Sequence, residues 1–210
     1  MIEMVLAKTG DLVFDYDHRQ LCSHVDPKHD AKLWVDRRLG ELDQSECIIV
    51  LGLGCGYHIL ELMSRLPQAK VFVLEAKKEI IEACMKVHGL DFAKLNVRII
   101  NSTHELQQSV WLDQALQAPY RILIHMPSYF ISEGVYGDVH RLLLARQWSS
   151  LTWLWQKRFG GHLIQQLQPI DSDGAELLSI KNLDQVINQS DIKGKSKSWM
   201  VFKALRELVT

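Results

Sequence analysis

Apolar runs and amphipathic stretches alternate along the middle of the chain. Four short segments are apolar almost throughout, and stretches with apolar residues at helical spacing lie between them. Strands that are buried on both faces and separated by helices are typical of a parallel sheet covered on both sides, so we expect an α/β fold. The expected strands are residues 47–53, 70–75, 97–100 and 120–126, and the expected helices are residues 57–66, 77–88 and 102–116.

The two ends of the chain show other patterns. Two short apolar segments, residues 4–7 and 12–16, flank a turn with Gly10, which predicts a β-hairpin. Asp26 and Pro27 predict a helix start, with Asp26 as the N-cap of a helix to about residue 39. We expect residues 1–46 to form an N-terminal extension, 47–168 the core, and 169–210 a segment that completes or flanks the sheet.

A longer helix is expected after the fourth strand. From residue 138 to about 159, apolar residues recur at spacings that place them on one helix face, Trp148 and Trp155 among them. Such a face is either part of the core or an interface. We therefore expect the 138–159 helix to be a possible contact for a homo-oligomer or a partner protein.

Composition narrows the function classes. The chain has 24 Lys and Arg against 25 Asp and Glu, a net charge of -1, which argues against nucleic acid as a partner. No stretch has the roughly 20 apolar residues of a membrane-spanning helix. The four cysteines form no Cys-x-x-Cys pair and the histidines lack zinc-ligand spacing. We expect a cytoplasmic protein without a metal site.

A glycine-rich turn joins the first strand of the expected sheet to the next helix. Gly52, Gly54 and Gly56 occupy alternate positions and are followed by Tyr57 and His58. Glycine allows a sharp turn and close approach of a ligand, and the helix N-terminus adds amides that attract anions. We expect this turn to bind part of a nucleoside-type ligand. The alternative is a tight strand-to-helix turn without a ligand.

An acidic residue closes the next strand. Glu75 follows Gly56 by 19 residues, and a carboxylate at this place can accept hydrogen bonds from two ribose hydroxyls. The base would lie between Glu75 and the turn of Asn101 and Ser102, at the carboxyl ends of the strands. Two ligands fit this pattern, S-adenosylmethionine and a nucleotide or nucleotide-sugar. The alternative role for Glu75 is to cap the following helix.

The turn resembles the first motif of class I S-adenosylmethionine-dependent methyltransferases, which often reads acid-x-Gly-x-Gly-x-Gly. Gly52 stands at the place of the acid, and His58 at the place of the last glycine. Residues 126–129, Met-Pro-Ser-Tyr, occupy the place of the Asn/Asp-Pro-Pro-Tyr/Phe motif of amino-methyltransferases. Because Met126 cannot accept hydrogen bonds from an amine, His125 is the candidate catalytic base. A histidine satisfied at a strand end is the other interpretation.

A further resemblance accounts for both departures. The N-terminal Rossmann-like domain of bacterial motility accessory factor proteins, which are linked to flagellin glycosylation, has a similar order of motifs over about residues 5–165. The matching residues are Ser23, Asp26-Pro27, Asp30-Ala31, the Gly-Leu-Gly-Cys-Gly-Tyr-His turn of residues 52–58, Glu75, and His125-x-Pro127-x-Tyr129.

This resemblance implies a Rossmann-like, methyltransferase-like fold and a nucleoside-binding module in surface glycan or flagellin modification. It places Ser23, Asp26, Pro127 and Tyr129 on the substrate side. An enzyme of this kind would be a transferase. The second domain of the family opens with a Gly-Pro-Ser motif that these 210 residues lack, so we expect the module alone. A class I methyltransferase with an atypical first motif is the alternative function.

Overall fold

A computed structural model of the chain describes residues 1–42, 47–89, 96–117, 120–145, 150, 153–154 and 156–157. The chain forms two compact units, Met1–His140 and Arg141–Thr210. The first unit contains both sheets and every candidate site residue. The domain boundaries expected at residues 46 and 168 fall on residues that the structure does not describe, so they stay predictions.

Four parallel strands form the central sheet, in the spatial order β6-β5-β4-β7. β4 (Cys47–Leu51) is buried along its whole length and pairs with β5 (Lys70–Glu75) on one side and β7 (Tyr120–Ile124) on the other. β6 (Asn96–Ile99) pairs with the outer side of β5. The order of the strands along the chain therefore switches direction between β4 and β7. Open α/β sheets bind ligands at such a switch point.

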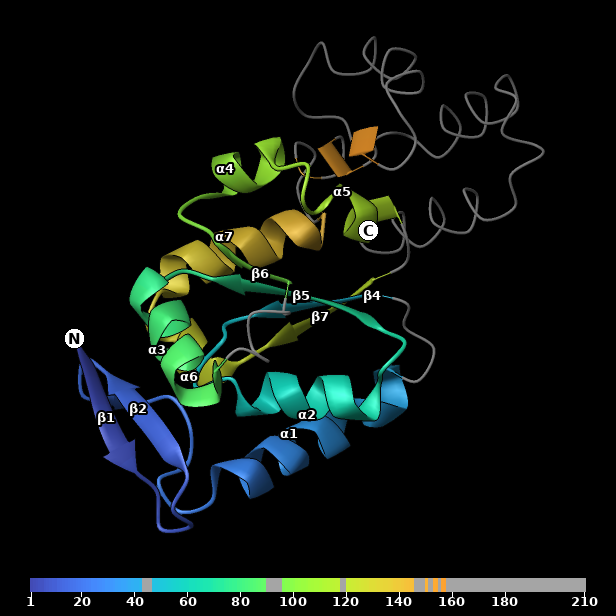
Figure 1. Cartoon of the computed structure of the whole chain (residues 1–210). Helices are drawn as coiled ribbons and strands as arrows, with labels where there is room; N and C mark the ends of the chain where they lie inside the picture. The colour runs from blue at the N-terminus through green and yellow to red at the C-terminus, as the bar shows by residue number, and fades with distance from the viewer. Residues whose placement is uncertain are drawn as a thin grey trace, which may run out of the picture. The chain divides into compact units, whose positions relative to one another are not determined.

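Helices cover both faces of this sheet (Figure 1). α1 (Pro27–Leu42) lies beside α2 (Tyr57–Arg65) on one face, and α7 (Glu133–Leu143) lies on the other. On the face of the sheet toward α2, alternate apolar side chains of the strands pack into one core with the helices. That core includes Ile48 and Val50 of β4, Val71 and Val73 of β5, Ile59 and Leu62 of α2, and Ile80 of α3 (Lys78–His88). The expected Rossmann-like α/β architecture is confirmed.

A second, antiparallel sheet precedes the first. β1 (Ile2–Leu6) pairs with β2 (Leu12–Tyr16), which confirms the expected hairpin, and β2 pairs with β3 (Arg19–Gln20), which the sequence did not predict. The β2–β3 turn uses two residues with positive φ, Asp17 at 48° and His18 at 61°. Asp and His adopt positive φ more readily than most other residues, but such turns are usually signalled by a glycine that this one lacks, so the signal was weak.

Helix starts were predicted better than helix ends. Asp26 Oδ1 accepts a hydrogen bond from His29 N at 2.9 Å, which confirms the N-cap of α1. Ser102 Oγ accepts one from Glu105 N at 3.2 Å, which confirms the start of α4 (Thr103–Gln108). The single helix expected over 102–116 is wrong, however. α4 ends before Ser109, whose Oγ accepts from Trp111 N at 3.3 Å, and a separate α5 (Asp113–Gln117) follows.

The long helix expected over 138–159 is also wrong. α6 (Met126–Tyr129) follows β7, and α7 begins at Glu133, before the residue 138 at which the helix was expected. Tyr136 N donates to Ser132 O at 3.0 Å in the first turn of α7. α7 ends at Leu143 because the chain turns at Ala145, whose φ is 52°. Trp148 and Trp155 lie outside the described residues. No helix in the described ranges is long and apolar enough to cross a membrane.

Candidate functional site

The glycine turn follows β4 and opens α2, as the sequence predicts. Gly52, Gly54 and Gly56 all have positive φ, at 98°, 49° and 85°. Two of them also face a close neighbour. A Cβ on Gly52 would lie 2.4 Å from Ser128 Cβ, and a Cβ on Gly54 would lie 2.4 Å from His125 Cε1. The turn therefore needs glycine because residues that follow β7 lie directly against it.

Ser128 connects the turn to His125. Gly54 N donates to Ser128 Oγ at 3.0 Å, and Ser128 Oγ lies 2.8 Å from His125 Nδ1. The His125 ring also stacks on the His58 ring, with centroids 4.1 Å apart and planes 6° apart. Burial lowers the pKa of His58 to about 3 and lowers the pKa of His125 well below its usual value. Both imidazoles are therefore neutral at physiological pH.

Side chains of α2 and α3 satisfy the carbonyl groups of the turn. Gly52 O lies 3.4 Å from His58 Nε2, Gly54 O accepts from Cys84 Sγ at 3.0 Å, and Cys55 O lies 2.7 Å from His88 Nε2. Sequence reasoning missed Cys84 and His88. Their four-residue spacing puts them on one face of α3, which was the available signal, but it does not identify the carbonyls that they contact.

Tyr57 points toward the antiparallel sheet. Its hydroxyl donates to Leu12 O at 2.8 Å, and its ring packs edge-on against His88 at 4.7 Å. Burial raises the pKa of Tyr57 to about 12. The side chain of Tyr57 thus connects the start of α2 to β2, while its backbone remains part of the turn.

Glu75 is 1% exposed, and both of its carboxylate oxygens have partners. Oε2 accepts from Leu53 N at 2.8 Å, and Oε1 accepts from Lys77 N at 3.0 Å and from the Tyr136 hydroxyl at 2.8 Å. Burial raises the pKa of Glu75, and these hydrogen bonds oppose the rise. Glu75 therefore holds the glycine turn, the start of α3 and α7 together.

Tyr136 is the main site residue that the sequence did not suggest. Its side chain is fully buried, and its hydroxyl also accepts from Ala76 N at 3.0 Å. Burial beside Glu75 raises the pKa of Tyr136 well above its usual value. The residue was missed because α7 begins earlier in the chain than the apolar spacing indicated.

Asn101 and Ser102 lie at the end of β6, and both are exposed. The Asn101 amide donates to Glu105 Oε2 at 3.0 Å, and Ser102 caps α4. Ile100 N donates to Glu75 O at 2.9 Å, so the two strand ends adjoin as expected. The contacts of both side chains are with α4 rather than with the Glu75 carboxylate.

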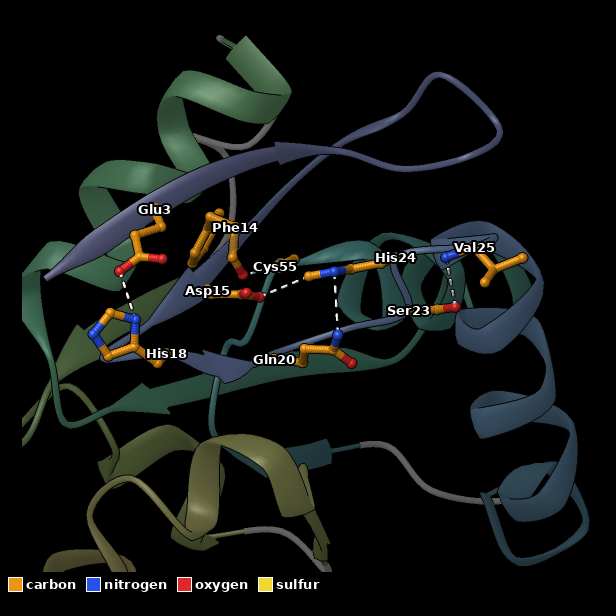
Figure 2. Close-up of polar contacts among 9 residues, drawn as sticks. All are labelled: Glu3, Phe14, Asp15, His18, Gln20, Ser23, His24, Val25 and Cys55. Atoms are coloured by element: carbon orange, nitrogen blue, oxygen red, sulfur yellow. Dashed lines mark hydrogen bonds and ion pairs between the residues drawn. The ribbon is translucent and has the colours of Figure 1, made fainter.

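Ser23 and Asp26 belong to a separate group of contacts. Ser23 Oγ accepts from Val25 N at 3.2 Å (Figure 2). It also accepts from Asp26 N at 3.3 Å, and the two bonds hold the loop that leads into α1. Beside them, His24 Nε2 lies 2.7 Å from Asp15 Oδ1, and its Nδ1 lies 3.1 Å from Gln20 Nε2. These contacts join the loop before α1 to β2 and β3.

Pro127 and Tyr129 lie in α6. Pro127 occupies the first turn of this helix, where proline is well tolerated. Tyr129 N donates to His125 O at 2.9 Å, and its ring lies 6.2 Å from the ring of Tyr136. The short helix therefore carries Ser128 into the turn and places Tyr129 beside the partner of Glu75.

A nucleoside does not fit this arrangement as it stands. Ser128 and His125 fill the space beside Gly52 and Gly54, and Tyr136 holds the Glu75 oxygen that a ribose hydroxyl would take. Binding would require Ser128 and Tyr136 to move. No group of three or more potential metal ligands comes together in the part of the chain that the structure describes.

A comparison with known protein families gives a match to the region that contains the glycine turn. Residues 7–109 match the family model described as the glycosyltransferase Maf N-terminal domain. The Maf match runs from the end of β1 through α4, so it includes the glycine turn and Glu75. His125, Tyr129 and Tyr136 follow the matched range. No curated protein and no solved structure gives a significant match.

Proposed function

We propose that this chain acts in the modification of flagellin or another glycosylated surface component, as a Rossmann-like module that binds a nucleoside. The observation that carries this proposal is the Maf N-terminal domain match over residues 7–109, which spans both the glycine turn and Glu75. The ligand class is a nucleotide or nucleotide-sugar, because glycosyl donors are commonly activated in that form. The site is the carboxyl edge of the parallel sheet.

The contacts of Glu75 support this site, and they indicate which hydrogen bonds a bound ribose would replace. The Tyr136 hydroxyl donates to Glu75 Oε1 and accepts from Ala76 N. A ribose hydroxyl can make both of these bonds, since it is also a donor and an acceptor. Nucleoside binding then exchanges the Tyr136 hydroxyl for a ribose hydroxyl, and the carboxylate stays paired throughout.

Calorimetric titration with cytidine nucleotides and, separately, with S-adenosylhomocysteine tests the proposal. We expect a cytidine nucleotide to bind. We expect Glu75→Gln to weaken binding roughly tenfold or more, because an amide keeps one acceptor oxygen where Glu75 uses two for Leu53 N and Lys77 N, so the ligand-binding edge loses a buried partner. Glu61→Ala is the matched control, since Glu61 pairs with Arg65 within α2, 3.4 Å apart.

The other outcomes separate the alternatives. Binding of S-adenosylhomocysteine alone, lost in Glu75→Gln, would favour a methyltransferase with an atypical first motif. Absence of binding by both ligands at millimolar concentration would show that the module is a scaffold, and the nucleoside part of the proposal would be wrong. If Glu61→Ala weakens nucleotide binding as much as Glu75→Gln does, the effect of Glu75→Gln is not specific, and Glu75 is not part of the site.

A further inference from the structure

β1 is the outer strand of the antiparallel sheet, and β2 lies beside it (Figure 1). In the part of the chain that the structure describes, no strand pairs with the other edge of β1. A free edge presents unpaired N–H and C=O groups to a further strand, so proteins usually protect it with charges, proline or a bulge. The pairing of β1 with β2 is unbroken from residue 2 to residue 6, and β1 contains no proline. This edge therefore lacks a bulge and a proline.

The backbone groups at the free edge belong to three apolar residues. Directly after β1, Ala7 N donates to Asp11 O at 2.8 Å, so the backbone groups of Ala7 point toward the β2 side. These groups alternate in direction along an antiparallel strand, so the odd-numbered residues of β1 also face β2. The N–H and C=O groups of Ile2, Met4 and Leu6 therefore point to the free edge.

Side chains of the same residues form an exposed apolar strip. Leu6 stands opposite Leu12 of β2, and opposite residues in an antiparallel pair have their side chains on one face. Met4 is 43% exposed, Leu6 69% and Leu12 39%. Contiguous exposed apolar residues mark interaction surfaces. A strand that pairs with β1 would cover this strip as well as satisfy the edge.

The sequence of β1 fits a second copy of itself. In an antiparallel pair centred on Met4, Ile2 of one copy stands opposite Leu6 of the other, so each outward backbone group of both strands has a partner. Glu3 then stands opposite Val5. A pair centred on Glu3 would instead bring two carboxylates together, which is unfavourable.

The ends of this pair are also complementary. Lys8 follows β1, and its backbone N donates to His24 O at 3.0 Å, so the free edge ends before Lys8. In the pair centred on Met4, Lys8 of one copy comes level with the start of β1 in the other. Asp17 lies there, since its N donates to Met1 O at 2.9 Å. Its carboxylate contacts the Met1 ammonium and is still 62% exposed, so it can attract a lysine from the second copy.

We propose that β1 pairs with β1 of a second copy, antiparallel and centred on Met4, so that the two antiparallel sheets become one continuous sheet. A single strand pair is small beside a standard protein interface, so the dimer forms reversibly. Leu12 O accepts from the Tyr57 hydroxyl at 2.8 Å, which connects this surface through β2 to the start of α2. The proposal does not depend on the ligand of the glycine turn.

Sedimentation velocity of the full chain over a range of concentrations tests the proposal. We expect a reversible equilibrium of monomer and dimer. Leu6→Lys should weaken dimerisation roughly tenfold or more, because an edge lysine opposes strand pairing. Val110→Lys is the matched control, since Val110 is 78% exposed and lies between α4 and α5, outside the antiparallel sheet.

A cross-link tests the register. Residues of a hydrogen-bonded antiparallel pair have Cα atoms about 5.5 Å apart, a separation that a disulfide spans. Met4→Cys should therefore give a covalent dimer when a small-molecule disulfide is added as oxidant, and Glu3→Cys should not. Peptide mapping identifies the linked residues. The parent chain is the control for its own thiols, among which Cys22 is half-buried.

The other outcomes contradict the proposal. A chain that stays monomeric up to about 1 mM would overturn it and leave the edge to a strand of a different protein. A dimer that Leu6→Lys leaves unchanged, or that Val110→Lys weakens as much, would place the interface elsewhere. A cross-link through Glu3→Cys in place of Met4→Cys would show another register and overturn the pairing centred on Met4. If Leu6→Lys does not fold, the presence or absence of the Met4→Cys cross-link decides.

Discussion

Tyr136 and Glu75 are joined by a buried hydrogen bond of 2.8 Å between a helix on one face of the sheet and the end of its second strand. The same hydroxyl accepts from Ala76 N at 3.0 Å. Two polar groups of β5 and its following turn thus depend on one side chain that lies 61 residues further along the chain. The relationship makes Tyr136 the most informative single position to change.

We expect Tyr136→Phe to lower the free energy of unfolding by about 1–3 kcal/mol, because it leaves a buried carboxylate oxygen and a part-buried amide each short of one partner. Urea denaturation measures this loss. Tyr129→Phe is the control, expected within about 0.5 kcal/mol of the parent. If Tyr136 competes with a ribose, Tyr136→Phe also binds cytidine nucleotides more tightly. An unchanged affinity together with lost stability would assign Tyr136 a structural role only.

Gly54→Ala is expected to destabilise the protein far more than Gly10→Ala. Both glycines have positive φ, but a Cβ at Gly10 meets no atom within 4 Å, whereas one at Gly54 meets His125 at 2.4 Å. Gly10→Ala should therefore cost about 1–2 kcal/mol in backbone strain alone. Gly54→Ala adds overpacking and should cost about 3 kcal/mol or more. Similar costs in thermal unfolding would mean that His125 does not lie against the turn.

The stability of the protein should fall in acid partly through His58. Its pKa is about 3 in the folded protein against an ordinary value of 6.5, so below pH 6.5 the unfolded chain binds a proton that the folded chain does not. The contribution of His58 is complete above pH 6.5 and is lost toward pH 3, with a slope of about 1.4 kcal/mol per pH unit. Urea titrations of the parent and His58→Phe between these pH values give the difference. Parallel curves would contradict a buried, neutral His58.

Asp26 is expected to act through the helix that it caps. Asp26→Ala removes the acceptor for His29 N and should cost about 1 kcal/mol, whereas Asp26→Asn keeps an acceptor and should cost much less. Denaturation of the two variants measures the contrast. Calorimetry with a cytidine nucleotide then tests whether Asp26 also lies on the substrate side. Loss of binding in Asp26→Asn at unchanged stability would support the substrate role.

The sequence predicts the elements of this fold where local signals agree. Buried strands such as β4 are apolar throughout, and the caps at Asp26 and Ser102 are local, so both were predictable. The end of α7 was not predictable. The apolar spacing continues past Leu143, and the turn at Ala145 contains no Gly or Pro that would indicate the end of a helix.

The partners within the site depend on distant parts of the chain. Glu75 and the glycines are visible in the sequence as a pattern, but Ser128, Tyr136, Cys84 and His88 meet them only because the topology brings separate segments together. Neither spacing nor residue type identifies such contacts. We expected the Glu75 carboxylate to be free to accept hydrogen bonds from a ligand. In the structure both of its oxygens already accept hydrogen bonds from the protein.

The complete pairing of Glu75 has an energetic consequence for any ligand. A hydroxyl that replaces that of Tyr136 forms no more bonds with the carboxylate than the protein already has, so the exchange at this point is close to neutral in free energy. The net affinity must then come from groups of the ligand that lie beyond its ribose. The ribose would therefore add little to selectivity, which would depend on the base and on the groups attached to the nucleoside.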